Sequence, residues 1–169
     1  NRLGVFQLVT IRLIVERALG LEHDSTYVQR HGQRRIALPK PRGSKVFHVY
    51  CSASNIGCKE LMDEVAQMSG RWSSLKLTED TNDLRAMRCE CMLLYLTAQT
   101  WTSSERSARL ASEVRLALDR KIRVVMAHEM PGVGGQSERH AVEFGTFFAE
   151  TPHVVLSLGL YDTLASPLK

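Results

Sequence analysis

The sequence predicts an α/β fold: a five-stranded parallel sheet of order 2-1-3-4-5, covered by helices on both faces as a three-layer sandwich. Three apolar runs, at residues 46–51, 92–96 and 122–127, alternate with segments of helical character. Strands buried on both faces of a parallel sheet read as such continuous apolar runs. The chain is 44% hydrophobic and 24% charged, which is ordinary for a globular protein with a sizeable core.

Each element has its own local signal. The first strand is expected at residues 45–51, with a helix after it at 56–68 that Ser54 or Asn55 caps and Gly70 ends. A short strand at 74–78 and an acidic turn at 79–83 lead into a brief helix through Arg88. The remaining elements are strands at 91–97, 122–127 and an edge strand at 154–156, and helices at 104–120, 138–150 and 160–165.

The order of the strands follows from the handedness of their connections. Crossovers between parallel strands are right-handed, so alternating strand–helix units wind into a flavodoxin-like sheet with the strand at 45–51 at its centre. Ligands of such sheets bind beyond the carboxyl ends of the strands, where the strand order reverses. Functional side chains are therefore expected among the residues that follow each strand.

Residues 1–44 are expected to form a separate N-terminal helix and basic linker, and residues 45–169 the α/β domain. Residues 3–19 suit a helix whose apolar residues form no single stripe, so it is expected to pack on a partner within a larger assembly. Its charges exclude a membrane span. No acid occurs between Asp24 and Glu60, and basic residues cluster there at Arg30, Arg34, Arg35, Lys40, Arg42 and Lys45. Both a solvated linker and a phosphate or membrane-surface patch remain open. The net charge of +4 is too small to indicate a nucleic-acid binder.

The four cysteines, Cys51, Cys58, Cys89 and Cys91, match no common zinc-site spacing, so no metal is expected. Two of them border apolar strands, which favours burial as small hydrophobic side chains. Unpaired thiols indicate a reducing compartment and therefore a cytoplasmic protein.

Several motifs together resemble a TIR domain, the Toll/interleukin-1-receptor fold. The run VFHVY at residues 46–50 resembles the first strand of that family, and ASEVRLAL at 111–118 is similar to the helix that carries its catalytic glutamate. The runs VVMAHE at 124–129 and EFGTFF at 143–148 look like a divergent subgroup from unicellular algae and other protists. The resemblance covers residues 45–169.

The resemblance implies a function for Glu113. TIR enzymes cleave NAD, as substrate and not as cofactor, between ribose and nicotinamide, and a nearby carboxylate stabilises the oxocarbenium-like transition state. Glu113 is the candidate catalytic residue. The structural alternative is a solvated acid that pairs with Arg109, four residues earlier on the helix.

Four further residues are candidates for ligand binding. Ser52 and Ser54 follow the first strand and can reach ligand hydroxyls or phosphate, or can simply form the turn. Trp101 follows the strand at 91–97 and can stack on a ring of the ligand, or pack in the core. His128 ends the strand at 122–127 and can titrate near neutral pH, or be held by structural hydrogen bonds.

Three hypotheses stay open: an NAD nucleosidase, a non-catalytic TIR adaptor that associates with other TIR domains, and a structural domain of a larger assembly. Glu113 favours the enzyme. About ten residues separate the second and third strands, whereas TIR enzymes carry a long loop there. That shortness favours the adaptor or the structural domain.

Overall fold

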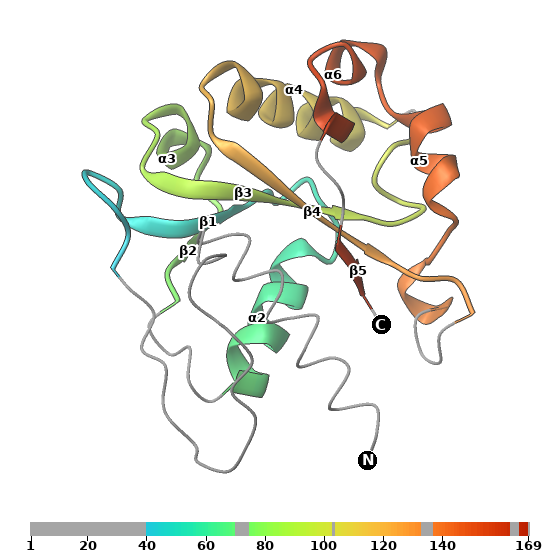
Figure 1. Ribbon diagram of the computed structural model, residues 1–169, viewed down its shortest axis with the longest axis horizontal. Helices are drawn as coiled ribbons and strands as arrows, with labels where there is room; N and C mark the ends of the chain where they lie inside the picture. The colour runs from blue at the N-terminus through green and yellow to red at the C-terminus, as the bar shows by residue number, and fades with distance from the viewer. Residues whose placement is uncertain (1–39, 70–74, 103, 133–136, 163–165, 169) are drawn as a thin grey trace.

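The protein is built around a parallel sheet. The computed structural model describes residues 40–69, 75–102, 104–132, 137–162 and 166–168. The helix expected at residues 3–19 lies outside these residues. The sheet has the order β2-β1-β3-β4-β5, and every pair of neighbouring strands is parallel (Figure 1). The strands are β1 (Phe47–Cys51), β2 (Leu77–Thr78), β3 (Cys89–Leu96), β4 (Arg123–Glu129) and β5 (Ser166–Leu168).

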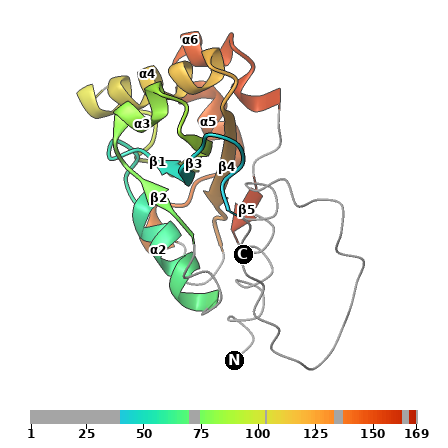
Figure 2. The same ribbon diagram turned by 90° about the vertical axis from the view of Figure 1, so that its left-hand side faces the viewer.

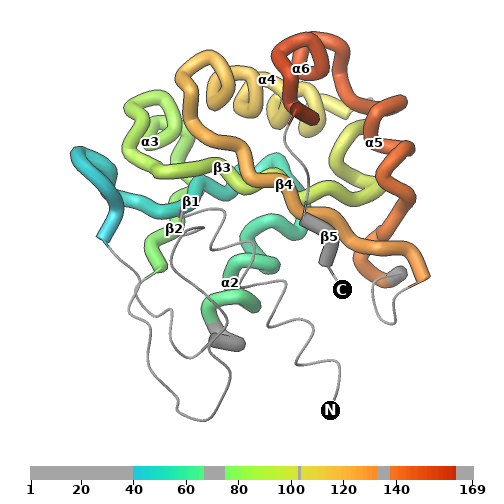
Figure 3. The backbone as a smooth tube through the Cα atoms, viewed as in Figure 1, coloured from blue at the N-terminus to red at the C-terminus, as the bar shows by residue number. Residues whose placement is uncertain are grey.

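Helices cover both faces of this sheet. One face carries α2 (Cys58–Ser69), and the other carries α3 (Thr81–Arg85), α4 (Glu105–Asp119), α5 (Phe144–Glu150) and α6 (His153–Leu156). The view from the side shows α2 below the strands and α3, α4 and α6 above them (Figure 2), and the backbone trace shows the same layers (Figure 3). The predicted α/β class and the parallel order of the first four strands are therefore confirmed.

The fifth strand is not where the sequence predicted it. Residues 154–156 belong to helix α6 instead of an edge strand, and β5 lies at Ser166–Leu168. A helical turn after Pro152 buries Val155 completely and leaves Val154 42% exposed. The prediction was wrong because two adjacent β-branched residues favour a strand locally, while tertiary packing here accepts only one of them.

Two other predicted helices differ in the structure. The one expected at 138–150 consists of a 3-10 turn at Ser137–Arg139 and of α5, and His140 between them has a φ of 59° that a right-handed helix cannot contain. Of the terminal helix expected at 160–165, the described part forms a 3-10 turn at Leu160–Asp162, and residues 163–165 lie outside the described residues.

The core divides into two clusters, one under each helical layer. Leu61, Met62 and Val65 of α2 pack on one face of the sheet, and Leu110, Val114 and Ala117 of α4 pack on the other. All four cysteines are buried as free thiols within these clusters, as expected. No helix in the described ranges has the length and apolar character needed to cross a bilayer.

Asn55 fixes the connection between β1 and α2 at the point where the strand order reverses. Its side-chain amide donates to the carbonyl of Tyr95 at 2.8 Å, and its oxygen accepts from the Tyr95 amide at 2.7 Å. Asn55 thus replaces β1 as hydrogen-bonding neighbour of β3, beyond the last paired position, Cys51 with Leu93. The carboxyl ends of β1 and β3 are held in register with the start of α2.

Candidate functional site

Glu113 lies at the carboxyl end of β1, on the face of the sheet covered by α3 and α4. Its carboxylate is half-buried, as its position beside the stripe of Leu110, Val114 and Ala117 predicts. Oε2 of Glu113 accepts a hydrogen bond of 3.0 Å from the hydroxyl of Tyr50, the penultimate residue of β1. The helix after β3 therefore brings Glu113 to the end of β1.

Tyr50 is fully buried, and its phenol stays protonated. Burial raises the pKa of the Tyr50 hydroxyl, and the neighbouring charge of Glu113 raises it further, against hydrogen bonding with Thr81 and Ser52. Thr81 Oγ1 of α3 lies 3.5 Å from the same phenol oxygen. Since the phenol keeps its proton, it acts as a fixed donor that orients the carboxylate of Glu113.

Ser52 and Ser54 lie in the turn after β1. Ser52 is 1% exposed, and its Oγ accepts from the backbone N–H of Ser54 at 3.0 Å. The Ser52 side chain also interacts with the Tyr50 phenol. The structure thus brings Ser52 and Glu113 together around Tyr50, and Ser54 joins them through its main chain.

Trp101 and His128 occupy a different place, an aromatic cluster with α5. The Trp101 indole is 3% exposed, and its Nε1 donates to the Tyr161 hydroxyl at 3.3 Å. The His128 ring is 5.2 Å from that of Phe144, whose own ring is 5.7 Å from Tyr161. These contacts fit the structural alternatives, core packing for Trp101 and a structurally held ring for His128, since little of either ring is exposed.

His128 is held neutral by its surroundings. Burial lowers the pKa of its imidazole, against a backbone hydrogen bond and the charge of Glu143. Its Nδ1 donates to the carbonyl oxygen of Glu129 at 3.2 Å. A neutral ring suits its contacts with Phe144 and Phe147.

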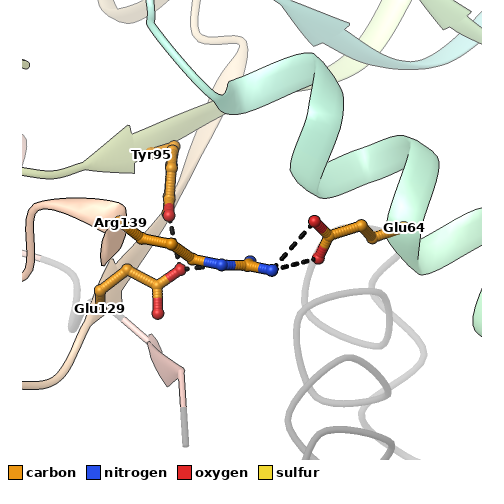
Figure 4. A network of polar contacts seen from close by, with 4 residues as sticks. All are labelled: Glu64, Tyr95, Glu129 and Arg139. Atoms are coloured by element: carbon orange, nitrogen blue, oxygen red, sulfur yellow. Dashed lines mark hydrogen bonds and ion pairs between the residues drawn. The ribbon is translucent and has the colours of Figure 1, made fainter. Parts of the chain in front are cut away.

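A second group of polar residues lies on the opposite face of the sheet, between β3, β4 and α2 (Figure 4). The Tyr95 hydroxyl donates to Oε1 of Glu129 at 2.5 Å. Arg139 lies between two acids: its Nη1 is 3.6 Å from Oε1 of Glu129, and its Nη2 donates to both carboxylate oxygens of Glu64, at 3.0 and 2.9 Å. We call these four residues, Glu64, Tyr95, Glu129 and Arg139, the α2-face network.

The network contains one deeply buried carboxylate. Glu129 is 1% exposed at the end of β4, and burial raises its pKa although Tyr95 and Arg139 both favour the charged form. Burial also raises the pKa of the Tyr95 phenol, as does its hydrogen bond to Glu129. The proton between them therefore stays on Tyr95, and Glu129 is the acceptor.

A pocket of about 180 Å³ opens beside this network. Its polar lining includes Glu60 and Glu64 from α2, Gln99 after β3, and Arg139 with His140 after β4. Ile56, Leu61 and the Tyr95 ring supply apolar walls. The pocket lies beyond the carboxyl end of β3, where sheets of this kind bind ligands.

The sequence did not predict the α2-face network as a site. Its members come from four separate segments, and no short spacing connects them. One signal was available: Glu129 ends β4, two residues after the apolar run at 122–127, and an acid in a buried strand needs partners.

Comparison with known proteins assigns no family. No protein-family model matches the chain, and no curated protein or solved structure matches it significantly.

Proposed function

We propose that this protein is a TIR-like domain that cleaves NAD into nicotinamide and ADP-ribose, with Glu113 as the catalytic carboxylate. One observation carries the proposal: the helix after β3 presents a half-buried glutamate at the carboxyl end of the inner strand β1, where Tyr50 orients it. Such a carboxylate faces both the solvent-accessible rim and the low-dielectric interior, where it stabilises positive charge more strongly than in water.

The reaction needs little from the protein besides the negative charge of the Glu113 carboxylate. The bond between C1′ of the ribose and the nicotinamide nitrogen breaks, and both electrons leave with the ring, which becomes neutral. Positive charge develops on the ribose, and the carboxylate of Glu113 stabilises it. Water then adds to C1′ and releases a proton to solvent.

Tyr50 acts as a positioning residue in this mechanism. Its hydroxyl engages Oε2 of Glu113, so Oε1 is the oxygen assigned to the ribose. The Tyr50 ring is fixed because it is fully buried. Thr81 of α3 is a further polar neighbour of the phenol, with its Oγ1 3.5 Å from the phenol oxygen. A carboxylate held in this way loses little freedom on substrate binding.

The proposal is tested by incubating the chain with NAD and measuring released nicotinamide. The wild type is expected to turn over, and Glu113→Ala to lose at least about a hundredfold in rate, as expected when a main electrostatic group is removed. Glu105→Ala is the matched control, because Glu105 lies on the same helix, is 82% exposed and forms an ion pair with Arg109, one turn further along α4. Equal rates for Glu113→Ala and the wild type, or a wild type without turnover, contradict the proposal.

A non-catalytic association domain is the second candidate. Glu79 and Asp80 alone connect β2 to α3, so the long loop of TIR enzymes has no counterpart at this position. Phe148, Val154 and Leu158 are between 41% and 47% exposed, on the consecutive elements α5, α6 and the turn after it. Exposed apolar side chains mark association surfaces where they form a contiguous patch. If the protein has this function, its sedimentation should depend on protein concentration and Phe148→Ser should abolish that dependence. No NAD turnover should be detected.

A further inference from the structure

The pocket on the α2 face has charges of both signs in its wall. Arg139 is 39% exposed and Glu64 is 45% exposed, and their charged groups meet at 2.9 Å. We propose that this pocket binds a small zwitterion of the free α-amino acid class, with Arg139 holding the ligand carboxylate and Glu64 the ligand ammonium. This site is separate from Glu113, which lies on the other face of the sheet.

The pair between Arg139 and Glu64 is one that a ligand can open. Both side chains are more than a third exposed, and water competes with such pairs, so little net energy is lost when they separate. A zwitterion replaces this single pair by two, one to each residue. An Arg guanidinium also binds a carboxylate through two parallel N–H groups, a geometry that the ligand can use.

Glu129 anchors Arg139 during this exchange. Its buried carboxylate lies 3.6 Å from Nη1 of Arg139, while Glu64 is engaged through Nη2. Arg139 can therefore turn Nη2 toward a ligand without leaving Glu129, and Glu129 keeps its hydrogen bond from Tyr95. No buried charge is left unpaired when the pocket fills.

The same charges disfavour ligands of a single sign. A simple anion would meet Glu60 and Glu64, both in the pocket wall, and a simple cation would meet Arg139. Only a ligand that carries both charges compensates both residues. This balance of charges in the pocket wall favours a zwitterion over a phosphate or an amine as the ligand.

The size of the pocket and its apolar walls narrow the class of ligand further. The volume of about 180 Å³ is below that of pockets for drug-sized ligands, which begin at about 300 Å³. Ile56, Leu61 and the Tyr95 ring offer apolar contact to a ligand side chain. Gly57 permits the Tyr95 ring to approach, since a Cβ at position 57 would lie 2.9 Å from its Cε1. An amino acid with an aliphatic side chain, such as L-leucine, matches these walls.

Calorimetric titration of the whole chain with L-leucine tests the proposal. We expect saturable binding of L-leucine, and binding at least about tenfold weaker for leucinamide, which lacks the carboxylate, and for N-acetyl-leucine, which lacks the ammonium. Glu64→Gln should weaken L-leucine binding at least about tenfold. Glu105→Gln, which opens the more exposed ion pair with Arg109 on α4, should leave it unchanged.

Three outcomes overturn the proposal. They are equal binding of either leucine derivative, unchanged binding by a folded Glu64→Gln variant, and no saturable binding of L-leucine or L-alanine up to about 10 mM. Arg139→Lys serves as a second variant, since it keeps a positive charge beside Glu129 while it removes the planar fork; it too should weaken binding. Glu113→Ala should bind L-leucine like the wild type, so failure of NAD cleavage and failure of this pocket are distinguishable.

Discussion

The hydroxyl of Tyr50 donates to Oε2 of Glu113 at 3.0 Å and so joins the inner strand β1 to helix α4. Tyr50 is fully buried and Glu113 half-buried, so the bond lies at the border between core and solvent. The two partners are not equivalent. Glu113 can turn toward water when the phenol is removed, whereas the phenol is left buried when Glu113 is removed.

Tyr50→Phe is expected to lower the free energy of unfolding by about 0.5–1.5 kcal/mol, the net value of one hydrogen bond. Urea denaturation measures this change. If Glu113 is catalytic, the same variant should also slow NAD cleavage, because the carboxylate is no longer oriented. Tyr161→Phe is the control: it removes a hydroxyl that bonds Trp101 and Thr151, so it should lower stability and leave cleavage unchanged. Full cleavage activity in Tyr50→Phe would refute a positioning role.

Asn55→Ala is expected to destabilise the protein by about 2–3 kcal/mol, because the Tyr95 amide then becomes a buried donor without a partner. The Tyr95 carbonyl is affected less, since Thr100 Oγ1 also donates to it at 2.9 Å. Urea denaturation again provides the measurement. Asn82→Ala, at an exposed position of α3, should stay within about 0.5 kcal/mol of the wild type. Equal stabilities of the two variants would show that Asn55 does not hold the strand end.

The central strands were predictable because their signal is local. β1, β3 and β4 are buried on both faces, and each therefore appears in the sequence as one apolar run. Glu113 was predictable as a rim residue for a similar reason: helical periodicity fixes its angle from the buried stripe of α4. Its partner Tyr50 was not, since their contact spans 63 positions and depends on how α4 packs.

The same physical reason, dependence on long-range packing, made the α2-face network impossible to predict. Glu64, Tyr95 and Arg139 are ordinary residues in their own segments, and only the packing of α2 against the sheet gives them common partners. β5 and α6 show the complementary limit, because short elements at the edge of a sheet are decided by tertiary contacts instead of by propensity. Burial of Glu129 was the one feature that local sequence could have indicated.

Glu129 is expected to make the protein less stable as pH rises. Burial raises its pKa in the folded state above the usual value of 4.5, so the folded protein binds more protons than the unfolded chain between these two values. Stability should therefore fall as pH rises from about 4.5 through the raised pKa. Glu129→Gln should remove this decline, and the Tyr95 hydroxyl can still donate to the amide oxygen. Urea midpoints measured against pH test this, and an identical decline in the variant would assign it to another group.

His128 is expected to have the opposite effect on the pH dependence of stability. Burial lowers its pKa below the usual value of 6.5, so the unfolded chain binds more protons as pH falls through 6.5, and stability is lost toward acid. His128→Phe keeps an aromatic ring against Phe144 and Phe147 and removes the titration. Urea midpoints from about pH 4.5 to about pH 7.5 cover both transitions. In His128→Phe only the contribution of Glu129 should remain, so this variant gains relative stability toward acid, whereas Glu129→Gln loses it. A profile of His128→Phe that still falls below pH 6.5 like the wild type would show that His128 is not the group responsible.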